Sequence, residues 1–132
     1  MPSIRIIVAF ATLVIAITPA RAQEWPTRPV TMVVPFAAGG PLDVVGRLLA
    51  SRLSQIFDRQ VVVENVTGAG GTIGSNRVAK AAPDGYQFVF GHIGTHVFSQ
   101  TLYKKLLYDA VTDFEPVVIV VFCYCSCARS SP

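Results

Sequence analysis

Two patterns of apolar residues mark the start of the part of the chain that we expect to fold. Residues 30–34 form a short β-branched run that is too brief for a helix and predicts a strand. Over residues 42–57 the apolar side chains recur at steps of three and four, which predicts an amphipathic helix. Between these segments, the glycine pair Gly39 and Gly40 lets the backbone turn, and Pro41 fits the first helical position.

The alternation of strand and helix continues along the chain. Residues 60–65 are apolar and β-branched, as is typical of a buried parallel strand. A glycine-rich loop over 66–74 leads into a short helix that we expect to reach about Ala82. Residues 86–90 then predict a third strand, and residues 91–96 a third loop of small residues. Connections of this length predict right-handed crossovers and a parallel sheet, which is an α/β fold.

The loops that follow parallel strands lie along one edge of their sheet. The loops 35–43, 66–74 and 91–96 should therefore converge where α/β proteins bind ligands. A helix start leaves backbone amides unpaired and carries the positive end of the helix dipole, so it can hold an anion without a cationic side chain. Asp43, in the first helical turn, has two interpretations: it favours the helix start, or it has a role at the ligand site. We expect a small anion or polar metabolite, held mostly by backbone amides.

The first 22 residues have the pattern of a secretory signal peptide. Arg5 supplies a positive start, residues 6–17 are apolar without interruption, and an Ala-x-Ala pattern ends at Ala22. The apolar run is short for a bilayer span, and an uncleaved anchor is the alternative. We predict cleavage after Ala22. Since this removes Arg5 and Arg21 from a chain with 11 basic and 8 acidic residues and a net charge of +3, the mature charge is +1.

The composition argues against several classes of partner and cofactor. No stripe of Lys and Arg with interleaved aromatic residues is present, which argues against nucleic acid. The three cysteines, Cys123, Cys125 and Cys127, alternate with other residues near the end of the chain, unlike a disulfide framework or the usual zinc pairs. The glycine spacing of the second loop departs from the dinucleotide fingerprint, and no loop ends in the Lys-Ser/Thr of a P-loop.

Catalytic motifs are equally weak. His92 and His96 have the four-residue spacing of zinc proteases but lack the glutamate, and Gly94 disfavours a helix, so we expect polar rim residues in a loop. A Ser-His-Asp triad would need Ser99, one of these histidines and Asp43 to converge without a nucleophile elbow. We therefore expect no metal and no cofactor, and these residues leave catalysis unsupported without excluding it.

A series of longer motifs follows in a fixed order along the chain. It comprises Trp25-Pro26-x-Arg28-Pro29, Val33-Val34-Pro35-Phe36-x-x-Gly39-Gly40-x-x-Asp43, Val62-Val63-Glu64-Asn65-x-x-Gly68-Ala69-Gly70-Gly71-x-Ile73-Gly74, Ala82-Pro83-Asp84-Gly85-Tyr86, Gly91-x-x-Gly94-Thr95-His96, and Leu102-Tyr103 through Tyr108-Asp109 to Asp113-Phe114-x-Pro116-Val117. With its exported start, the chain resembles the Bug, or TctC-like, substrate-binding proteins of tripartite tricarboxylate transporters. The resemblance covers residues 24–118.

The resemblance implies the fold of a type II-like periplasmic binding protein, in which two α/β lobes close on a small carboxylate. Residues 23–121 would be an incomplete first lobe, with a parallel sheet flanked by helices. Its loops would grip the ligand carboxylate through the backbone and bound water. Asp43 would fix the first loop or meet the amino group of an amino-acid ligand, and His92 and Thr95 would be rim contacts. The other ligand-binding residues implied are Phe36, Ala37, Ala38, Gly39, Gly40, Gly70, Gly71 and Thr72.

The resemblance also implies a periplasmic protein that captures a di- or tricarboxylate, or an amino acid, and passes it to membrane permease subunits. A non-functional fragment, a ligand-sensing adaptor for a signalling partner and an α/β enzyme are the alternatives.

Two features depart from the family. The chain has about half the length of two lobes of ordinary size, and residues 122–132 match no family pattern. We expect an incomplete lobe with a frameshifted or disordered tail. A strand returning from the second lobe would normally help complete the sheet, so we expect an unpaired apolar edge, marginal stability, and weak or no carboxylate binding.

Overall fold

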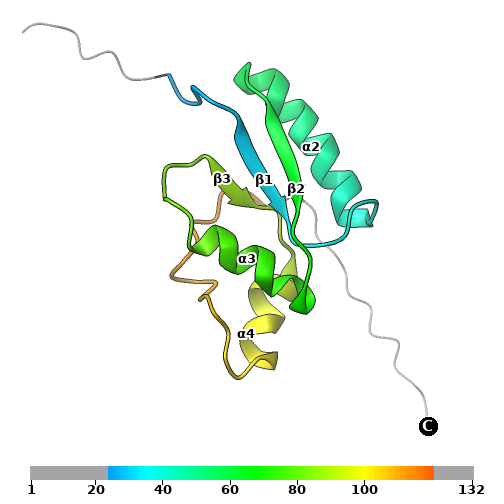
Figure 1. Cartoon of the computed structure of the whole chain (residues 1–132), viewed down its shortest axis with the longest axis vertical. Helices are drawn as coiled ribbons and strands as arrows, with labels where there is room; N and C mark the ends of the chain where they lie inside the picture. Colours follow the sequence, from blue (N-terminus) through cyan, green and yellow to red (C-terminus); the bar gives the residue numbers. More distant parts are fainter. Residues whose placement is uncertain (1–23, 121–132) are drawn as a thin grey trace, which may run out of the picture.

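The computed structural model describes residues 24–120; the expected signal peptide, its cleavage after Ala22 and the tail at 122–132 lie outside the described residues. Three parallel strands form a sheet in the order β2-β1-β3 (Figure 1). They are β1 (Val30–Val34), β2 (Val61–Asn65) and β3 (Gln87–Val89). The α/β class and the parallel sheet flanked by helices are therefore confirmed.

Strand β1 is the centre of both the sheet and the core. It pairs with β2 along its whole length and with β3 over residues 31–33. Val30, Met32, Val33 and Val34 are fully buried. Successive side chains of a strand point to opposite faces of the sheet. Because both faces of this central strand are covered, apolar residues follow one another along it and do not alternate with polar ones.

Helix α2 (Pro41–Phe57) covers one face of the sheet, within one residue of the predicted start. Gly46 allows the close approach, since a Cβ there would lie 3.2 Å from Val34 Cγ2 and 3.3 Å from Phe90 Cδ1. The buried cluster between helix and sheet contains Val30, Met32, Val34, Ala50 and Val61. The apolar side chains packed around it are Phe36, Leu42, Leu49, Leu53, Phe57, Val63, Tyr86, Phe88 and Phe90.

Helix α3 (Thr72–Ala79) lies on the opposite side of the sheet from α2 (Figure 1). It follows a 3₁₀ turn (Ala69–Gly71) and ends about three residues before the expected end at Ala82. Pro83 drives Ala82, the residue before it, away from helical conformation, so the helix cannot reach its expected end.

The prediction of a loop over residues 91–96 was wrong at its second half. Residues Gly94–Phe98 form a π-helical turn that continues into α4 (Ser99–Leu102). The amide of Gly94 donates to Nδ1 of His92 (2.8 Å), and the amide of His92 donates to Oγ1 of Thr95 (3.1 Å). The first bond gives the amide of Gly94 an acceptor at the start of the helix, and the second ties Thr95 to His92, the residue before the N-cap Ile93.

Segments before β1 and after α4 also pack on the folded part of the chain, whereas residues 117–120 are exposed. Trp25 lies before β1 and contacts Phe57, with ring centroids 5.3 Å apart, so it covers an edge of the core. After α4 the chain returns over the third loop, where the hydroxyl of Tyr108 donates to the carbonyl of Thr95. Phe114 packs edge-on against Tyr108, with ring centroids 5.7 Å apart.

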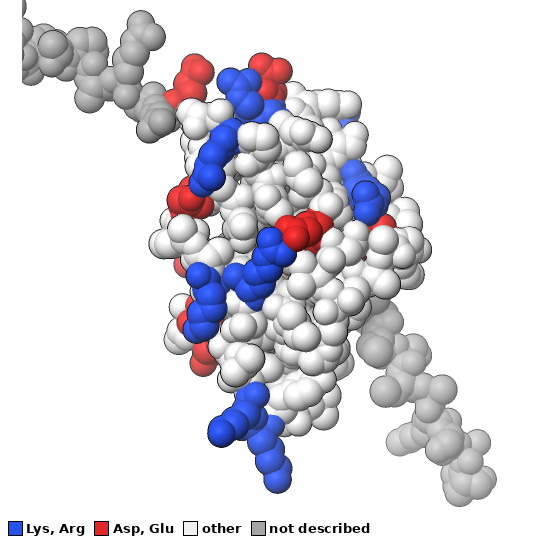
Figure 2. Space-filling model, in the orientation of Figure 1, with Lys and Arg blue, Asp and Glu red and all other residues white. Residues whose placement is uncertain are grey.

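Charged side chains are spread over the surface. On the face shown in Figure 2, basic residues lie apart from one another or beside acidic ones. Two of the exposed ion pairs are Arg28–Asp84 and Arg77–Glu64. Between residues 24 and 120, every helix is too short or too polar to cross a membrane.

Candidate ligand site at the carboxyl edge of the sheet

The three loops that follow the strands meet at one edge of the sheet, as predicted. A Cβ on Gly71 of the second loop would lie 3.2 Å from Cζ of Phe36 in the first loop and 2.6 Å from Cγ2 of Thr95 in the third. The ring of Phe36 also packs on that of His92, with centroids 4.7 Å apart. The chain passes from β1 to β2 on one side and then to β3 on the other, so the strand order reverses at this edge, where α/β sheets bind ligands.

The first loop presents backbone amides to solvent. The amide of Gly40 donates to the carbonyl of Ala37 (3.3 Å), and Gly39 has a positive φ of 80°. Ala37, Ala38 and Gly39 are exposed. Among the described residues, no acceptor contacts the amides of Ala37 and Ala38. Because they precede the N-terminus of α2, these amides are suited to bind an anion.

The carboxylate of Asp43 holds this loop in place through hydrogen bonds. Its Oδ2 accepts hydrogen bonds from the amide of Gly39 (2.8 Å) and Nε of Arg47 (2.9 Å). Its Oδ1 accepts one from Nδ2 of Asn65 (2.9 Å). Asp43 is buried, with only 2% of its surface exposed. Of the two roles that the resemblance implied for Asp43, this geometry matches the one in which it fixes the first loop.

The same contacts keep Asp43 ionised. The hydrogen bond from Arg47, followed by those from Gly39 and Asn65, holds the pKa of Asp43 well below its usual range. The bond to Asp43 in turn raises the pKa of Arg47. Near neutral pH this carboxylate is therefore an acceptor of hydrogen bonds and holds no proton to donate.

The second loop turns through left-handed backbone at four successive residues. The φ angles are 127° at Gly68, 46° at Ala69, 66° at Gly70 and 92° at Gly71. The amide of Gly71 donates to the carbonyl of Gly68 (2.9 Å), whereas the exposed amides of Ala69 and Gly70 meet no acceptor within residues 24–120. The hydroxyl of Thr72 donates to the carbonyl of Ala69 (2.9 Å) and so supports the turn.

The third loop differs from the rim that we expected. Thr95 is fully buried; its hydroxyl donates to the carbonyl of His92 (2.8 Å) and lies 2.8 Å from Nδ1 of His96. It therefore supports the loop from inside. Burial lowers the pKa of His96, whose half-buried ring packs edge-on against that of Phe114, with centroids 5.1 Å apart. His92 is half-buried, and because its Nδ1 accepts from Gly94, its neutral form carries the proton on Nε2.

Sequence reasoning missed three residues that hold these loops. Arg47 and Asn65 complete the contacts of Asp43, and the hydroxyl of Tyr103 donates to the carbonyl of Ala69 (3.2 Å). Arg47 could have been found, because it lies four residues after Asp43 and shares its helix face. Asn65 and Tyr103 reach partners more than twenty residues away, and no local pattern signals such contacts.

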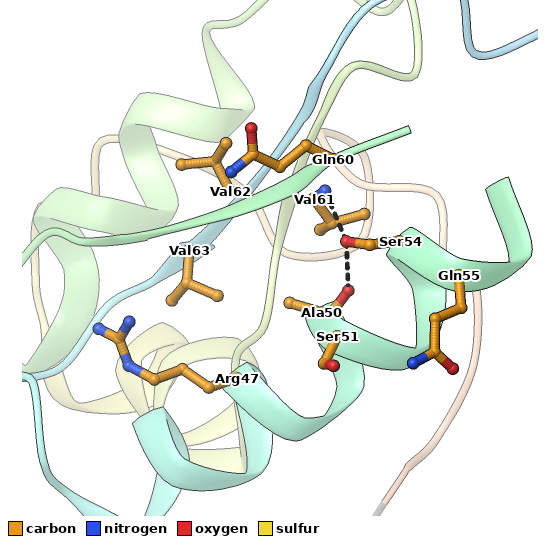
Figure 3. A pocket seen from close by; sticks show the side chains of 9 residues that line it. All are labelled: Arg47, Ala50, Ser51, Ser54, Gln55, Gln60, Val61, Val62 and Val63. Carbon is orange, nitrogen blue, oxygen red and sulfur yellow. Dashed lines mark hydrogen bonds between the residues drawn. The ribbon is translucent and has the colours of Figure 1, made fainter. Parts of the chain in front are cut away.

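Two hollows lie near these loops: one lies away from the three-loop edge, and the other is lined in part by Ala69 and Thr72 of the second loop. A groove of about 660 Å³ runs between α2 and β2, where Ser54 joins the two elements and Arg47 extends past Val63 (Figure 3). A second hollow of about 310 Å³ is lined by Ala69, Thr72, Ile73, Asn76, Tyr103, Lys105, Leu106 and Leu107. In the described part of the chain, no group of three or more His, Cys, Asp or Glu residues could hold a metal ion.

Residues 45–127 match the model of the tripartite tricarboxylate transporter family receptor, TctC. The chain belongs to this family. Members with solved structures are periplasmic binding proteins, in agreement with the ordered motifs.

The relatives of this TctC-family chain are longer proteins than the chain itself. A UPF0065 protein of Agrobacterium vitis, from the TAR-I ttuE-ttuC' intergenic region, is 45% identical over 117 residues, which are 88% of this chain and 34% of the relative. The periplasmic binding protein BugD has a TM-score of 0.67 and 52% identity, over 70% of this chain and 30% of BugD. MatC of Rhodopseudomonas palustris, solved with bound malate, has a TM-score of 0.68 and 47% identity, over 70% of this chain and 32% of MatC. The chain thus spans about a third of the length of these relatives.

Proposed function

We propose that the three-loop edge binds a carboxylate group of a small solute through backbone amides. The observation that carries this proposal is the set of exposed amides without acceptors, at Ala37 and Ala38 in one loop and Ala69 and Gly70 in another. An anion placed there gains hydrogen bonds and the favourable field of a helix N-terminus. The malate bound to MatC, a member of the same family, supports a carboxylate as the ligand class.

Each candidate residue then has a distinct part. Ala37, Ala38 and Gly70 bind with their amides, while Gly39, Gly40 and Gly71 give the loops their shape. Asp43 and Thr72 hold the first and second loop in place. The packed rings of Phe36 and His92 form one wall of the site. The Nε2–H group of His92 is the polar group of this wall and can donate a hydrogen bond to the ligand. Thr95 acts indirectly, as support for His92.

The protein's place in the cell follows from its family and its first residues. We infer that residues 1–22 are a signal peptide cleaved after Ala22, and that the chain acts in the periplasm. There it serves as the solute-binding component of a tripartite transport system, and it delivers its ligand to the membrane permease subunits. A di- or tricarboxylate or an amino acid would satisfy the amides equally, since each carries a carboxylate.

Residues 23–121 act as part of the N-terminal lobe of a two-lobe binding protein. The opposing wall of the site belongs to the remaining two thirds of the relatives' length. We expect residues 23–121 on their own to bind a carboxylate weakly, with a dissociation constant of about 1 mM, because one wall of the site supplies few contacts to offset the entropy lost on binding.

A calorimetric titration with malate and with its diamide tests this function. The diamide has the size and shape of malate but lacks negative charge. We expect heat of binding with malate and none with the diamide, because the amides and the helix dipole favour an anion. Equal binding of both compounds, or binding of the diamide alone, would contradict the proposal.

A further inference from the structure

Asn65 stands at the junction of the two loops that present open amides. It is the last residue of β2, so its backbone leads directly into the second loop. Its side chain reaches the first loop, where Nδ2 donates to the carbonyl of Phe36 (3.0 Å). The residue is thus joined to one loop by the chain and to the other by a hydrogen bond.

Every polar group of this side chain has a partner that fixes its orientation. Nδ2 carries two protons and lies within hydrogen-bond distance of two oxygens, the carbonyl of Phe36 and Oδ1 of Asp43 (2.9 Å). Oδ1 accepts from Nη2 of Arg47 (3.0 Å). Because both neighbours of Nδ2 are acceptors and the neighbour of Oδ1 is a donor, the opposite orientation of the amide would face unfavourable contacts on each side.

Arg47 joins the same network from α2. Its Nε donates to Asp43 and its Nη2 to Asn65, so one planar guanidinium holds the carboxylate and the amide at a fixed separation. The carboxylate of Asp43 in turn holds the amide of Gly39. A continuous set of hydrogen bonds therefore runs from α2 through the end of β2 to the tip of the first loop.

We propose that Asn65 is a positioning residue that sets the first loop relative to the second, with Arg47 holding its amide in place. The consequence for a ligand rests on the proposed function, since a carboxylate that touches amides of both loops needs them at a fixed separation. The geometry of the loops in the ligand-free protein can be measured without any ligand.

Hydrogen exchange of the Gly39 amide, followed by NMR on the ligand-free protein, tests the positioning role. N65D replaces the two donors with an acceptor that faces Phe36 and Asp43, and we expect Gly39 to exchange about tenfold faster. N65A removes the donors without adding charge, and we expect a smaller change in the same direction. R47K keeps the charge beside Asp43 but cannot bridge both partners, so its effect should lie between those of wild type and N65D.

The matched control is R77A. Arg77 pairs with Glu64, the neighbour of Asn65 on β2, and the pair lies outside the network. We expect wild-type exchange at Gly39 in R77A, although the variant loses an ion pair of the same strand. Equal acceleration in R77A and N65A, or wild-type exchange in N65A, would overturn the proposal.

Titration with malate then measures the effect on binding. We expect the affinity for malate to fall about tenfold in N65D and to stay within twofold in R77A. A wild-type chain that does not bind malate would count against the proposed function, while the exchange of Gly39 would still decide the positioning role of Asn65. Unchanged malate affinity in N65D, with binding intact in the wild type, would overturn the link between loop position and ligand.

Discussion

Two glycines of the candidate site differ in what a side chain would meet. Both have positive φ, 80° at Gly39 and 92° at Gly71. A Cβ on Gly39 has nothing within 4 Å, whereas one on Gly71 would lie 2.6 Å from Cγ2 of Thr95 and 3.2 Å from Cζ of Phe36. Gly39 is therefore constrained by backbone conformation alone, and Gly71 by conformation and by the contact between loops.

Alanine substitutions separate these two constraints. We expect G39A to lower the free energy of unfolding by about 1 kcal/mol, from left-handed backbone alone. We expect G71A to lower it by about 3 kcal/mol, because overpacking adds to the same strain. Urea unfolding of both variants measures the difference. Equal losses would mean that the loops do not touch at Gly71.

The pH dependence of stability reports on Asp43. Its folded pKa is depressed, first by the hydrogen bond from Arg47, so its stabilising effect is present above the unfolded pKa of about 3.8 and is lost as the pH falls below it. We expect D43N to melt at a lower temperature than wild type at pH 7, and the gap to narrow as the pH falls from about 4 toward 2. Melting curves across this range test the prediction, and a constant gap would contradict it.

The sequence predicts those features of the site whose backbone geometry is set by glycine and proline. Gly39, Gly40 and Pro41 indicate an open helix start by their residue types alone, and α2 has that start. The burial of Thr95 is not predictable in this way, since a threonine in a loop of small residues is typical of a polar, exposed position. The hydroxyl of Thr95 donates to the carbonyl of His92, three residues earlier. The carbonyl of Thr95 accepts a hydrogen bond from Tyr108, thirteen residues later, which holds Thr95 in its buried position.

At the scale of elements, Ser54 connects α2 to the edge of the sheet. Its Oγ donates to the carbonyl of Ala50 (2.7 Å) and accepts from the amide of Val61 (2.8 Å) at the start of β2 (Figure 3). The hydroxyl thus satisfies a backbone amide that points away from β1, at an edge where a strand has no further partner among the described residues.

We expect S54A to lower the free energy of unfolding by about 1–2 kcal/mol, because the amide of Val61 loses its acceptor in a partly buried position. Ser51, one turn earlier on the same helix, is exposed and provides the matched control. S51A should stay within about 0.5 kcal/mol of wild type. Chemical denaturation of both variants compares them, and a loss in S51A as large as that in S54A would contradict the role of this hydrogen bond.

The strands and α2 are predictable because periodicity and β-branching dominate them. The helix from Gly94 is not, because glycine has low helix propensity and the acceptor for the amide of Gly94 is the ring of one particular side chain, His92. Pro83 keeps Ala82 out of α3, although the helical pattern extends to that residue. Local propensity thus decides which elements form, and side-chain contacts and prolines decide where they end.

At the scale of the whole molecule, β3 pairs only with β1 within residues 24–120. An unpaired strand edge is a template for association with another chain. We expect the chain to self-associate, with an average mass that rises with concentration in light scattering. A monomer mass over a hundredfold range of concentration would contradict this expectation.

The central claim is that backbone amides of two loops bind a carboxylate at the carboxyl edge of the sheet. The most direct measurement is residue-resolved NMR of the labelled chain during addition of malate. The account predicts that the largest amide shift changes occur at Ala37, Ala38, Ala69 and Gly70, with little change at Ser51 and Val62 in the groove between α2 and β2. Changes centred on that groove, or absent from both loops at saturating malate, would contradict it.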